Sequence, residues 1–319
     1  MRLLILGGSG FVGRAVADEA VRRGYDVTVF NRGQRDAPDG VTTLTGDRLG
    51  DLSALESGFW DAVVDTWSAQ GEAVRRTAEL LSGRAGYYAY VSSRSVYSGE
   101  QHEKAEDAPL VDAADEGYAG DKLRGEQGAA AFDGPVLLAR AGLILGPHED
   151  IGRLPWWLNR LARGGPTLAP GPRDNTLQYI DARDLANFLL DASLVHAAGP
   201  FDLVSESGHT TMGELLDIAN EVTGGRAELR WTDPSVIEAA GIEPWTQLPI
   251  WLPPGELHDF LHDGDVSKAY GQGLVCRPVR ETIADTWEWL QSLPGDAPQR
   301  ADRPRVGVDP AVEAKVLGQ

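Results

Sequence analysis

Tyr118 and Lys122 stand four residues apart in the segment Tyr-Ala-Gly-Asp-Lys. On a helix this spacing places both side chains on one face. An ammonium beside a phenol stabilises the phenolate, so such a pair can exchange a proton with an alcohol or a carbonyl oxygen. We therefore expect Tyr118 to act as a general acid/base with Lys122 assisting it, on a helix that a sheet must position.

A run of polar side chains lies upstream of this pair. The apolar segment 87–91 predicts a buried strand, and Ser92, Ser93, Arg94 and Ser95 follow it directly. In open α/β sheets, ligands bind outside the carboxyl ends of the strands. We expect Ser93 to join Tyr118 and Lys122 in a catalytic set at that edge, and Arg94 and Ser95 to face the substrate.

The chain opens with a predicted strand, a glycine turn and a predicted helix. The turn, Gly-Gly-Ser-Gly-Phe-Val-Gly at 7–13, contains the spacing Gly-x-Gly-x-x-Gly. Glycine permits the dihedrals of the turn and a close approach to a pyrophosphate, and the helix N-terminus offers free amides to its oxygens. This context predicts a dinucleotide site. The contacts that we expect there are Gly7, Gly10, Phe11, Val12 and Gly13.

The end of the second predicted strand distinguishes the two nicotinamide cofactors, because a carboxylate there binds the ribose hydroxyls of NAD. This chain instead has Asn31, Arg32 and Arg35. Guanidinium groups form strong charge-assisted bonds to phosphate oxygens, so these residues favour NADP, with NAD as the alternative. Asp47, after the third predicted strand, is a candidate adenine contact. Trp67, after the fourth, is a candidate wall beside the nicotinamide.

Short apolar runs alternate with helix-like stretches along the first half of the chain. This alternation predicts an α/β fold, a doubly wound parallel sheet of the Rossmann type covered by helices on both faces. Pro, Gly and Trp become frequent after about residue 150, which indicates a smaller substrate-binding lobe. We expect the Rossmann domain in 1–150 and 176–205, the lobe in 151–175 and 206–291, and a tail in 292–319 that packs as an arm or remains mobile.

The composition restricts the partners. Lys and Arg total 29 against 48 Asp and Glu, a formal net charge of −19, which opposes approach to nucleic acid and to anionic membranes. Cys276 is the single cysteine, and no Cys/His cluster shows metal-ligand spacing. The apolar stretch before the glycine turn is too short for a signal-peptide core. We expect a cytoplasmic protein with a small-molecule ligand and no structural metal.

The motifs together resemble an extended short-chain dehydrogenase/reductase of the epimerase/dehydratase branch. The similarity covers nearly all of residues 1–290 and includes the segments 140–147 and 179–186. It implies that Ser93 orients the substrate oxygen, that Tyr118 with Lys122 moves the proton, and that hydride passes between nicotinamide C4 and a substrate carbon. Because similar proteins commonly dimerise, it also makes a homodimer a candidate assembly.

Two positions depart from the pattern of that family. Nucleotide-sugar epimerases commonly have an Asn where Leu143 stands, and a His with small residues where this chain has Asp-Thr-Trp-Ser at 65–68. Both departures weaken a sugar-nucleotide assignment. In the lobe, the candidate substrate contacts are His148, Trp157 and Arg173.

We therefore carry three hypotheses forward. The first is an NADP(H)-dependent dehydrogenase/reductase that acts on a carbonyl/alcohol of a small, fairly apolar metabolite. The second is a nucleotide-sugar epimerase or dehydratase with tightly bound NAD. The third is a non-catalytic NAD(P)-binding protein, in line with an atypical branch of the family whose Asn-Arg-Gly turn is similar to residues 31–33.

Overall fold

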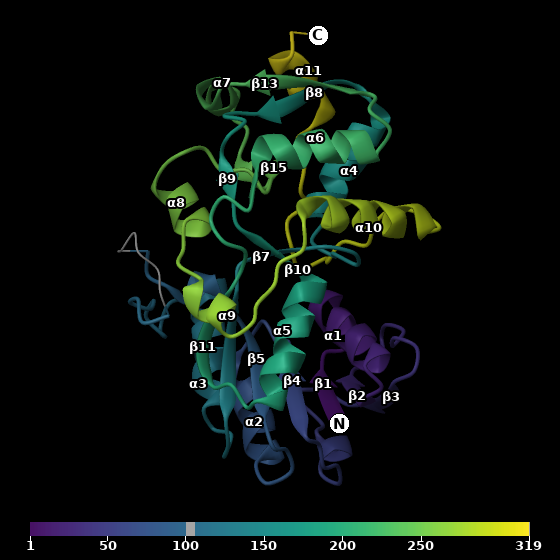
Figure 1. Cartoon of the computed structure of the whole chain (residues 1–319), viewed down its shortest axis with the longest axis vertical. Coiled ribbons are helices and arrows are strands. Elements are labelled where there is room, and N and C mark those ends of the chain that lie inside the picture. Colours follow the sequence, from purple (N-terminus) through teal and green to yellow (C-terminus); the bar gives the residue numbers. More distant parts are fainter. Residues whose placement is uncertain (100–105, 319) are drawn as a thin grey trace. The chain divides into compact units, whose positions relative to one another are not determined.

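The computed structural model describes residues 1–99 and 106–318, which fold into two compact units (Figure 1). The first unit comprises Met1–Gly142, Ala182–Val204 and Asp265–Val275. The second comprises Leu143–Asp181, Ser205–Gly264 and Cys276–Gln319.

The first unit is built on a seven-stranded sheet in which every neighbouring pair is parallel. The strand order is β11-β6-β5-β4-β1-β2-β3. The strands are β1 (Arg2–Leu6), β2 (Asp26–Asn31), β3 (Thr42–Thr45), β4 (Ala62–Asp65), β5 (Tyr88–Ser93), β6 (Val136–Ala141) and β11 (Gly199–Leu203). The helices are α1 (Phe11–Arg22), α2 (Gly71–Leu81), α3 (Tyr118–Ala129), α5 (Ala182–Leu194) and α9 (Ser267–Gly271), with short 3-10 helices η1 (Ser53–Leu55) and η2 (Arg94–Val96).

The sheet runs outward in both directions from β1, which has β2 on one side and β4 on the other. Because parallel crossovers are right-handed, α1 and α2 must cover opposite faces. Accordingly α1 packs on α5, whereas α2 packs on α3 (Figure 1). The Rossmann-type α/β fold is thereby confirmed.

The central strands are apolar because both faces of the sheet are covered. Residues 3–6 of β1 and all four residues of β4 are buried, and β5 is buried throughout. Such nearly continuous apolar runs are typical of parallel sheets. Asp65 ends β4, and the serines Ser92 and Ser93 end β5, so these buried polar residues stand at the carboxyl ends of their strands.

The second unit combines short strand pairs with a helical core. Its strands are β7 (Leu143–Leu145), β8 (Gly165–Pro170), β9 (Thr176–Leu177), β10 (Tyr179–Asp181), β12 (Thr210–Thr211), β13 (Ala227–Thr232), β14 (Pro244–Trp245) and β15 (Leu248–Pro249). Its helices are α4 (Arg153–Arg163), α6 (Met212–Val222), α7 (Pro234–Ala239), α8 (Glu256–His262), α10 (Val279–Ser292) and α11 (Pro310–Val316). Helices α4, α6 and α10 pack on one another around a buried apolar cluster.

The unit boundaries differ from those expected from the sequence. Residues 143–150 and 176–181 lie in the second unit, because β7 pairs with β10 instead of extending the seven-stranded sheet. Residues 265–275 belong to the first unit, where the Lys268 ammonium donates to the Pro200 carbonyl and lies 4.3 Å from the centre of the Phe201 ring.

Residues 292–318 pack within the second unit instead of forming a separate tail. Val308 belongs to the apolar core, and Glu313 of α11 is only 6% exposed. The Glu313 carboxylate accepts hydrogen bonds from Arg160 Nε at 2.8 Å and from the backbone N–H of Leu168 at 3.0 Å. A buried ion pair therefore anchors the C-terminal helix to α4 and β8.

None of the helices within residues 1–99 and 106–318 has the length and apolar character needed to cross a membrane.

We predict that Glu313→Ala lowers the free energy of unfolding of the second unit by about 3 kcal/mol, because Arg160 is left as an unpaired buried charge. Lys315→Ala, on the exposed side of the same helix, should change it by under about 0.5 kcal/mol. Chemical denaturation of the full chain measures both. Equal effects of the two substitutions would contradict the anchoring role of Glu313.

Candidate active site

The glycine turn after β1 divides into glycines that the fold requires and one that it does not. A Cβ on Gly13 would lie 2.3 Å from the Gly7 carbonyl oxygen, and one on Gly7 would lie 2.4 Å from Thr66 Oγ1. Gly7 also has a φ of +98°. A Cβ on Gly10 would meet only the Gly7 carbonyl oxygen, at 3.6 Å, which is ordinary contact. Packing therefore does not require glycine at position 10, and its absence of a side chain leaves the backbone open to the close approach of a ligand.

The first turn of α1 fits the phosphates of a dinucleotide. A helix leaves its first N–H groups without partners inside the helix, and here they include those of Phe11, Val12 and Gly13. The N-cap residue is Gly10, which brings no side chain to bond them. The amides remain suited to a pyrophosphate, whose charge also interacts favourably with the helix dipole.

The end of β2 carries an amide where NAD-binding sites place a carboxylate. Asn31 Nδ2 donates to Ser9 Oγ at 2.8 Å, and Asn31 Oδ1 accepts from the backbone N–H of Gly33 at 2.8 Å. These bonds tie the loop after β2 to the glycine turn. Arg32 and Arg35 follow on the surface of this loop.

The loop after β3 places Asp47 on the surface and its neighbour Arg48 in the interior. Asp47 Oδ1 accepts from the backbone N–H of Leu49 at 2.8 Å. The Arg48 guanidinium donates to both oxygens of Asp65, at 2.8 and 2.7 Å, and to Thr77 Oγ1 at 2.7 Å. Sequence reasoning missed this pair, although a charged residue at the end of an apolar strand could have signalled it.

Asp65 is ionised despite its complete burial. Burial opposes the charge of Asp65, but the Arg48 guanidinium lowers the pKa of this carboxyl. Hydrogen bonds from the Tyr88 hydroxyl and the backbone N–H of Trp67 lower it further, so the pKa lies below its usual value. Trp67 itself is half-buried, and its indole N–H donates to the Gln70 carbonyl at 3.0 Å.

Lys122 is fixed between the carboxyl ends of β4 and β5. It is 2% exposed, and its ammonium donates to the Val91 carbonyl at 2.6 Å and to the Trp67 carbonyl at 2.8 Å. The ammonium also lies 4.9 Å from the centre of the Tyr90 ring. A cation is thereby held at the sheet edge where the sequence predicted it.

Tyr118 is the first residue of α3, one turn before Lys122, and it is 39% exposed. The neighbouring phenol of Tyr90 is different. Burial raises the pKa of Tyr90 well above its usual value, and the charge of Asp65 adds to the rise. Of these two phenols, Tyr90 is buried and Tyr118 is exposed.

Ser93 ends β5 and is the N-cap of η2. It is 7% exposed, its hydroxyl donates to Ser95 Oγ at 3.1 Å, and it accepts from the backbone N–H of Ser95 at 3.1 Å. Helix α3 packs on both β5 and η2. The structure thus brings Ser93, Tyr118 and Lys122 to the same edge of the first unit, with Ser95 half-buried beside them.

A buried polar network lies under this edge. Ser92 Oγ donates to Glu126 at 2.6 Å, Glu126 pairs with Arg140 at 2.9 Å, and Arg140 donates to the Tyr97 hydroxyl at 3.1 Å. The Tyr97 hydroxyl in turn donates to Asp202 at 2.6 Å. The network joins α3 to β5, β6 and β11.

Arg94 is part of this network, although the sequence suggested that it faces the substrate. It is 4% exposed, and its Nε lies 3.5 Å from Asp202 Oδ2. Burial raises the pKa of Asp202 to about 6, against the opposing effects of the Arg94 charge and the Tyr97 hydrogen bond. The placement of Arg94 favours a role in packing and charge balance.

The remaining predicted contacts lie in the second unit. Trp157 is fully buried in the core, and its indole N–H donates to the Pro249 carbonyl at 2.7 Å, so its role is packing. Arg173 is exposed, pairs with Asp217, and has its guanidinium 4.5 Å from the centre of the Trp231 ring. The half-buried His148 ring lies 5.1 Å from that of Trp289.

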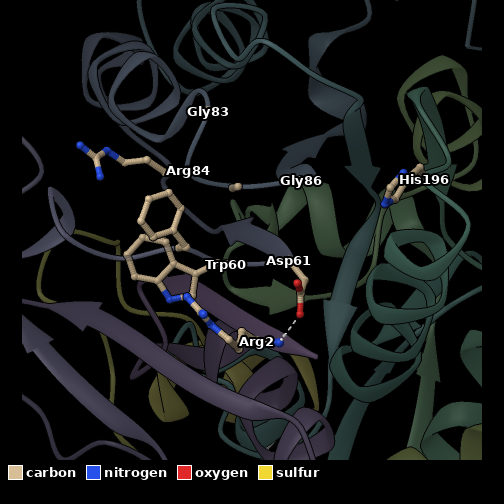
Figure 2. A pocket seen from close by; sticks show the side chains of 9 residues that line it. Arg2, Trp60, Asp61, Gly83, Arg84, Gly86 and His196 are labelled. Carbon is tan, nitrogen blue, oxygen red and sulfur yellow. Dashed lines mark hydrogen bonds between the residues drawn. The ribbon is translucent and has the colours of Figure 1, made fainter.

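The first unit also contains a hollow of about 470 Å³, and Figure 2 shows side chains that line it. It is lined by residues that precede or begin β1, β4, β5 and β11, among them Arg2, Trp60, Arg84 and His196, so it lies at the amino edge of the sheet. Asp61 accepts there from the backbone N–H of Arg2 at 2.6 Å. None of the predicted site residues lines it, and it is separate from the candidate active site.

Comparison with known proteins agrees with this geometry. The family model of the NAD dependent epimerase/dehydratase family matches residues 3–200, well over half of the chain. The chain belongs to this family. It is therefore an NAD(P)-dependent enzyme of the oxidoreductase type.

Among characterised proteins, a 2-alkyl-3-oxoalkanoate reductase of Stenotrophomonas maltophilia (strain K279a) is 28% identical over 68% of this chain and 74% of its own length. Among solved structures, the Bordetella bronchiseptica enzyme WbmG in complex with NAD and UDP has a TM-score of 0.66 at 20% identity, covering 91% of this chain and 95% of its own. The UDP-glucose 4-epimerase of Thermus thermophilus in complex with NAD has a TM-score of 0.63 at 18% identity, covering 92% and 99%. The structural likenesses concern the fold.

Two glycine substitutions should separate ligand binding from folding. Gly10→Ala should leave the free energy of unfolding within about 0.5 kcal/mol of wild type and weaken dinucleotide binding at least tenfold, because the new methyl group occupies the phosphate approach. Gly13→Ala should destabilise the first unit by about 2 kcal/mol, because its Cβ collides with a backbone carbonyl. Calorimetric titration and chemical denaturation provide the two readouts. Wild-type dinucleotide affinity in Gly10→Ala would refute the ligand-based explanation of this glycine.

Proposed function

We propose that the protein is an NADP(H)-dependent short-chain dehydrogenase/reductase that acts on a carbonyl/alcohol of a small, fairly apolar metabolite, with Tyr118 as the acid/base. The observation that carries the proposal is the placement of Lys122. Its ammonium is buried on the carbonyls of Val91 and Trp67, one helical turn from the exposed phenol of Tyr118 and at the same sheet edge as Ser93.

Each residue of this set has a distinct task. When bound, the nicotinamide ring supplies or accepts a hydride at C4. During reduction Tyr118 donates its phenol proton to the carbonyl oxygen, and during oxidation it takes the proton of the alcohol. The positive charge of Lys122 stabilises the phenolate and holds the ribose hydroxyls on the nicotinamide side. The Ser93 hydroxyl orients the substrate oxygen towards Tyr118.

The choice of NADP rests on the loop after β2. Asn31 stands at this strand end, so no carboxylate is available there for a ribose diol. The Asn31 side chain bonds Ser9 and Gly33 instead. Arg32 and Arg35 are exposed in the same loop and suit a 2′-phosphate. Asp47, on the surface after β3, is the proposed adenine contact.

Two findings support a carbonyl substrate with apolar surroundings. The reductase relative is named for a 3-oxo acid with alkyl substituents. In this chain the backbone carbonyl of Trp67 accepts from Lys122, and we take the half-buried indole of this residue as the apolar wall. Of the predicted substrate contacts, we keep those that are not fully buried, namely Ser95, His148 and Arg173.

An NAD-dependent epimerase or dehydratase is the second candidate, because solved relatives include an NAD and UDP complex and a UDP-glucose 4-epimerase. Leu143, in β7, argues against this candidate, since an apolar side chain cannot form a hydrogen bond to a sugar nucleotide. Binding of UDP-sugars by the purified protein would favour this candidate. The ordered Ser93, Tyr118 and Lys122 set argues against a non-catalytic binding protein.

We predict that Tyr118→Phe lowers kcat/KM at least 100-fold, because the substitution removes the transferable proton and preserves the ring. NADPH oxidation with a panel of 3-oxo acids and small ketones measures this. The Kd for NADPH should stay within about threefold of wild type, because the ring that lines the site is retained.

Tyr87→Phe is the matched control. Tyr87 directly precedes β5, at the opposite end of the strand from Ser93. The substitution removes its hydroxyl, which donates to the Ala197 carbonyl. Its turnover should equal that of wild type. If Tyr118→Phe retained wild-type turnover, Tyr118 would not be the acid/base and the proposed function would lose its central residue.

A further inference from the structure

Arg48 and Asp65 are joined to Lys122 through the backbone of one residue. The backbone N–H of Trp67 donates to Asp65 Oδ1 at 2.9 Å, and the carbonyl of Trp67 accepts from the Lys122 ammonium at 2.8 Å. The Arg48 guanidinium also lies 5.4 Å from the centre of the Trp67 indole. The backbone N–H of Trp67 is thus held by Asp65, its backbone carbonyl by Lys122, and its indole ring lies near Arg48.

Arg48 is fixed from the other side as well. Besides Asp65, its guanidinium donates to the Ala73 carbonyl at 3.1 Å and to Thr77 Oγ1 at 2.7 Å, both on α2. Arg76 of the same helix donates to the carbonyls of Leu49 and Gly50 at 2.7 and 3.1 Å. The loop that carries Asp47 is therefore bonded to α2 at the three residues that follow Asp47.

Because Arg48 and Asp65 are buried, the two charged groups must be well oriented towards each other. Arg48 is 7% exposed and Asp65 is 0% exposed, and a buried ion pair contributes little net stability compared with apolar residues of similar size. Its bidentate geometry fixes direction as well as distance. Such a pair is better explained by a need for position than by a need for stability.

We propose that Arg48 and Asp65 are positioning residues that set the spacing between the two ends of the dinucleotide site. On one side they hold the loop of Asp47, the proposed adenine contact. On the other side they hold the backbone N–H of Trp67. The carbonyl of the same residue aims the Lys122 ammonium at the nicotinamide ribose. This inference rests on the proposed function. It implies that losing the pair weakens binding of the whole dinucleotide more than binding of its adenine half.

The test compares NADPH with adenosine 2′,5′-bisphosphate, which contains only the adenine end. The triple variant Arg48→Met, Asp65→Leu and Tyr88→Phe removes the pair, fills its volume and leaves no orphaned Tyr88 hydroxyl. We expect its Kd for NADPH to rise about tenfold, as expected for the loss of one hydrogen bond to a charged group. The Kd for the bisphosphate should change by less than about twofold.

Arg48→Lys carries the test if the triple variant does not fold. It keeps the charge but cannot make two parallel bonds to Asp65, and we expect an approximately threefold loss that is again confined to NADPH. Glu72→Gln with Arg75→Gln, an exposed pair on α2, is the matched control and should change neither Kd. If wild type prefers NADH, the same comparison is made with NADH and ADP.

Equal weakening of both ligands would show that the pair shapes only the adenine loop, and unchanged affinity for both would show that it positions nothing. Either result overturns the inference alone. A wild-type protein that binds neither NADPH nor NADH would instead overturn the proposed function, and the inference with it.

Discussion

Helix α3 carries Tyr118 and Lys122, and its position on the sheet depends on the buried ion pair between Glu126 and Arg140. Glu126 lies one turn beyond Lys122 and also accepts from Ser92, the neighbour of Ser93. The Glu126 carboxylate therefore connects the helix to the strand end that carries Ser93, the third residue of the proposed catalytic set. Loss of either partner would leave an uncompensated buried charge, which costs about 3–5 kcal/mol.

Glycine lets this polar helix come close to its neighbours. A Cβ on Gly125 would lie 2.1 Å from the Tyr90 hydroxyl, and one on Gly128 would lie 2.7 Å from the Gly71 carbonyl of α2. The close approach brings the Lys122 ammonium within reach of strand-end carbonyls, where it is desolvated and fixed. The position of Lys122 thus depends on backbone proximity, while Tyr118 remains exposed.

The fold class, the glycine turn and the placement of Ser93, Tyr118 and Lys122 at one sheet edge could be predicted because each depends on local spacing or on a short apolar run. The partners of Arg48 and Glu126 could not. Arg48 meets Asp65 across 17 residues and Glu126 meets Arg140 across 14, and only the strand order brings them together. For the same reason the sequence suggested that Trp157 and Arg94 face a ligand, whereas packing places both inside.

The most direct test of the account is a titration of the purified apo protein with NADPH and with NADH, followed by nicotinamide fluorescence and thermal stability. Asn31, Arg32 and Arg35 at the end of β2 predict at least tenfold tighter binding of NADPH, since a 2′-phosphate gains charge-assisted bonds that a hydroxyl cannot make. Tighter binding of NADH, or a protein that retains NAD through purification, would contradict the account and favour an epimerase or dehydratase.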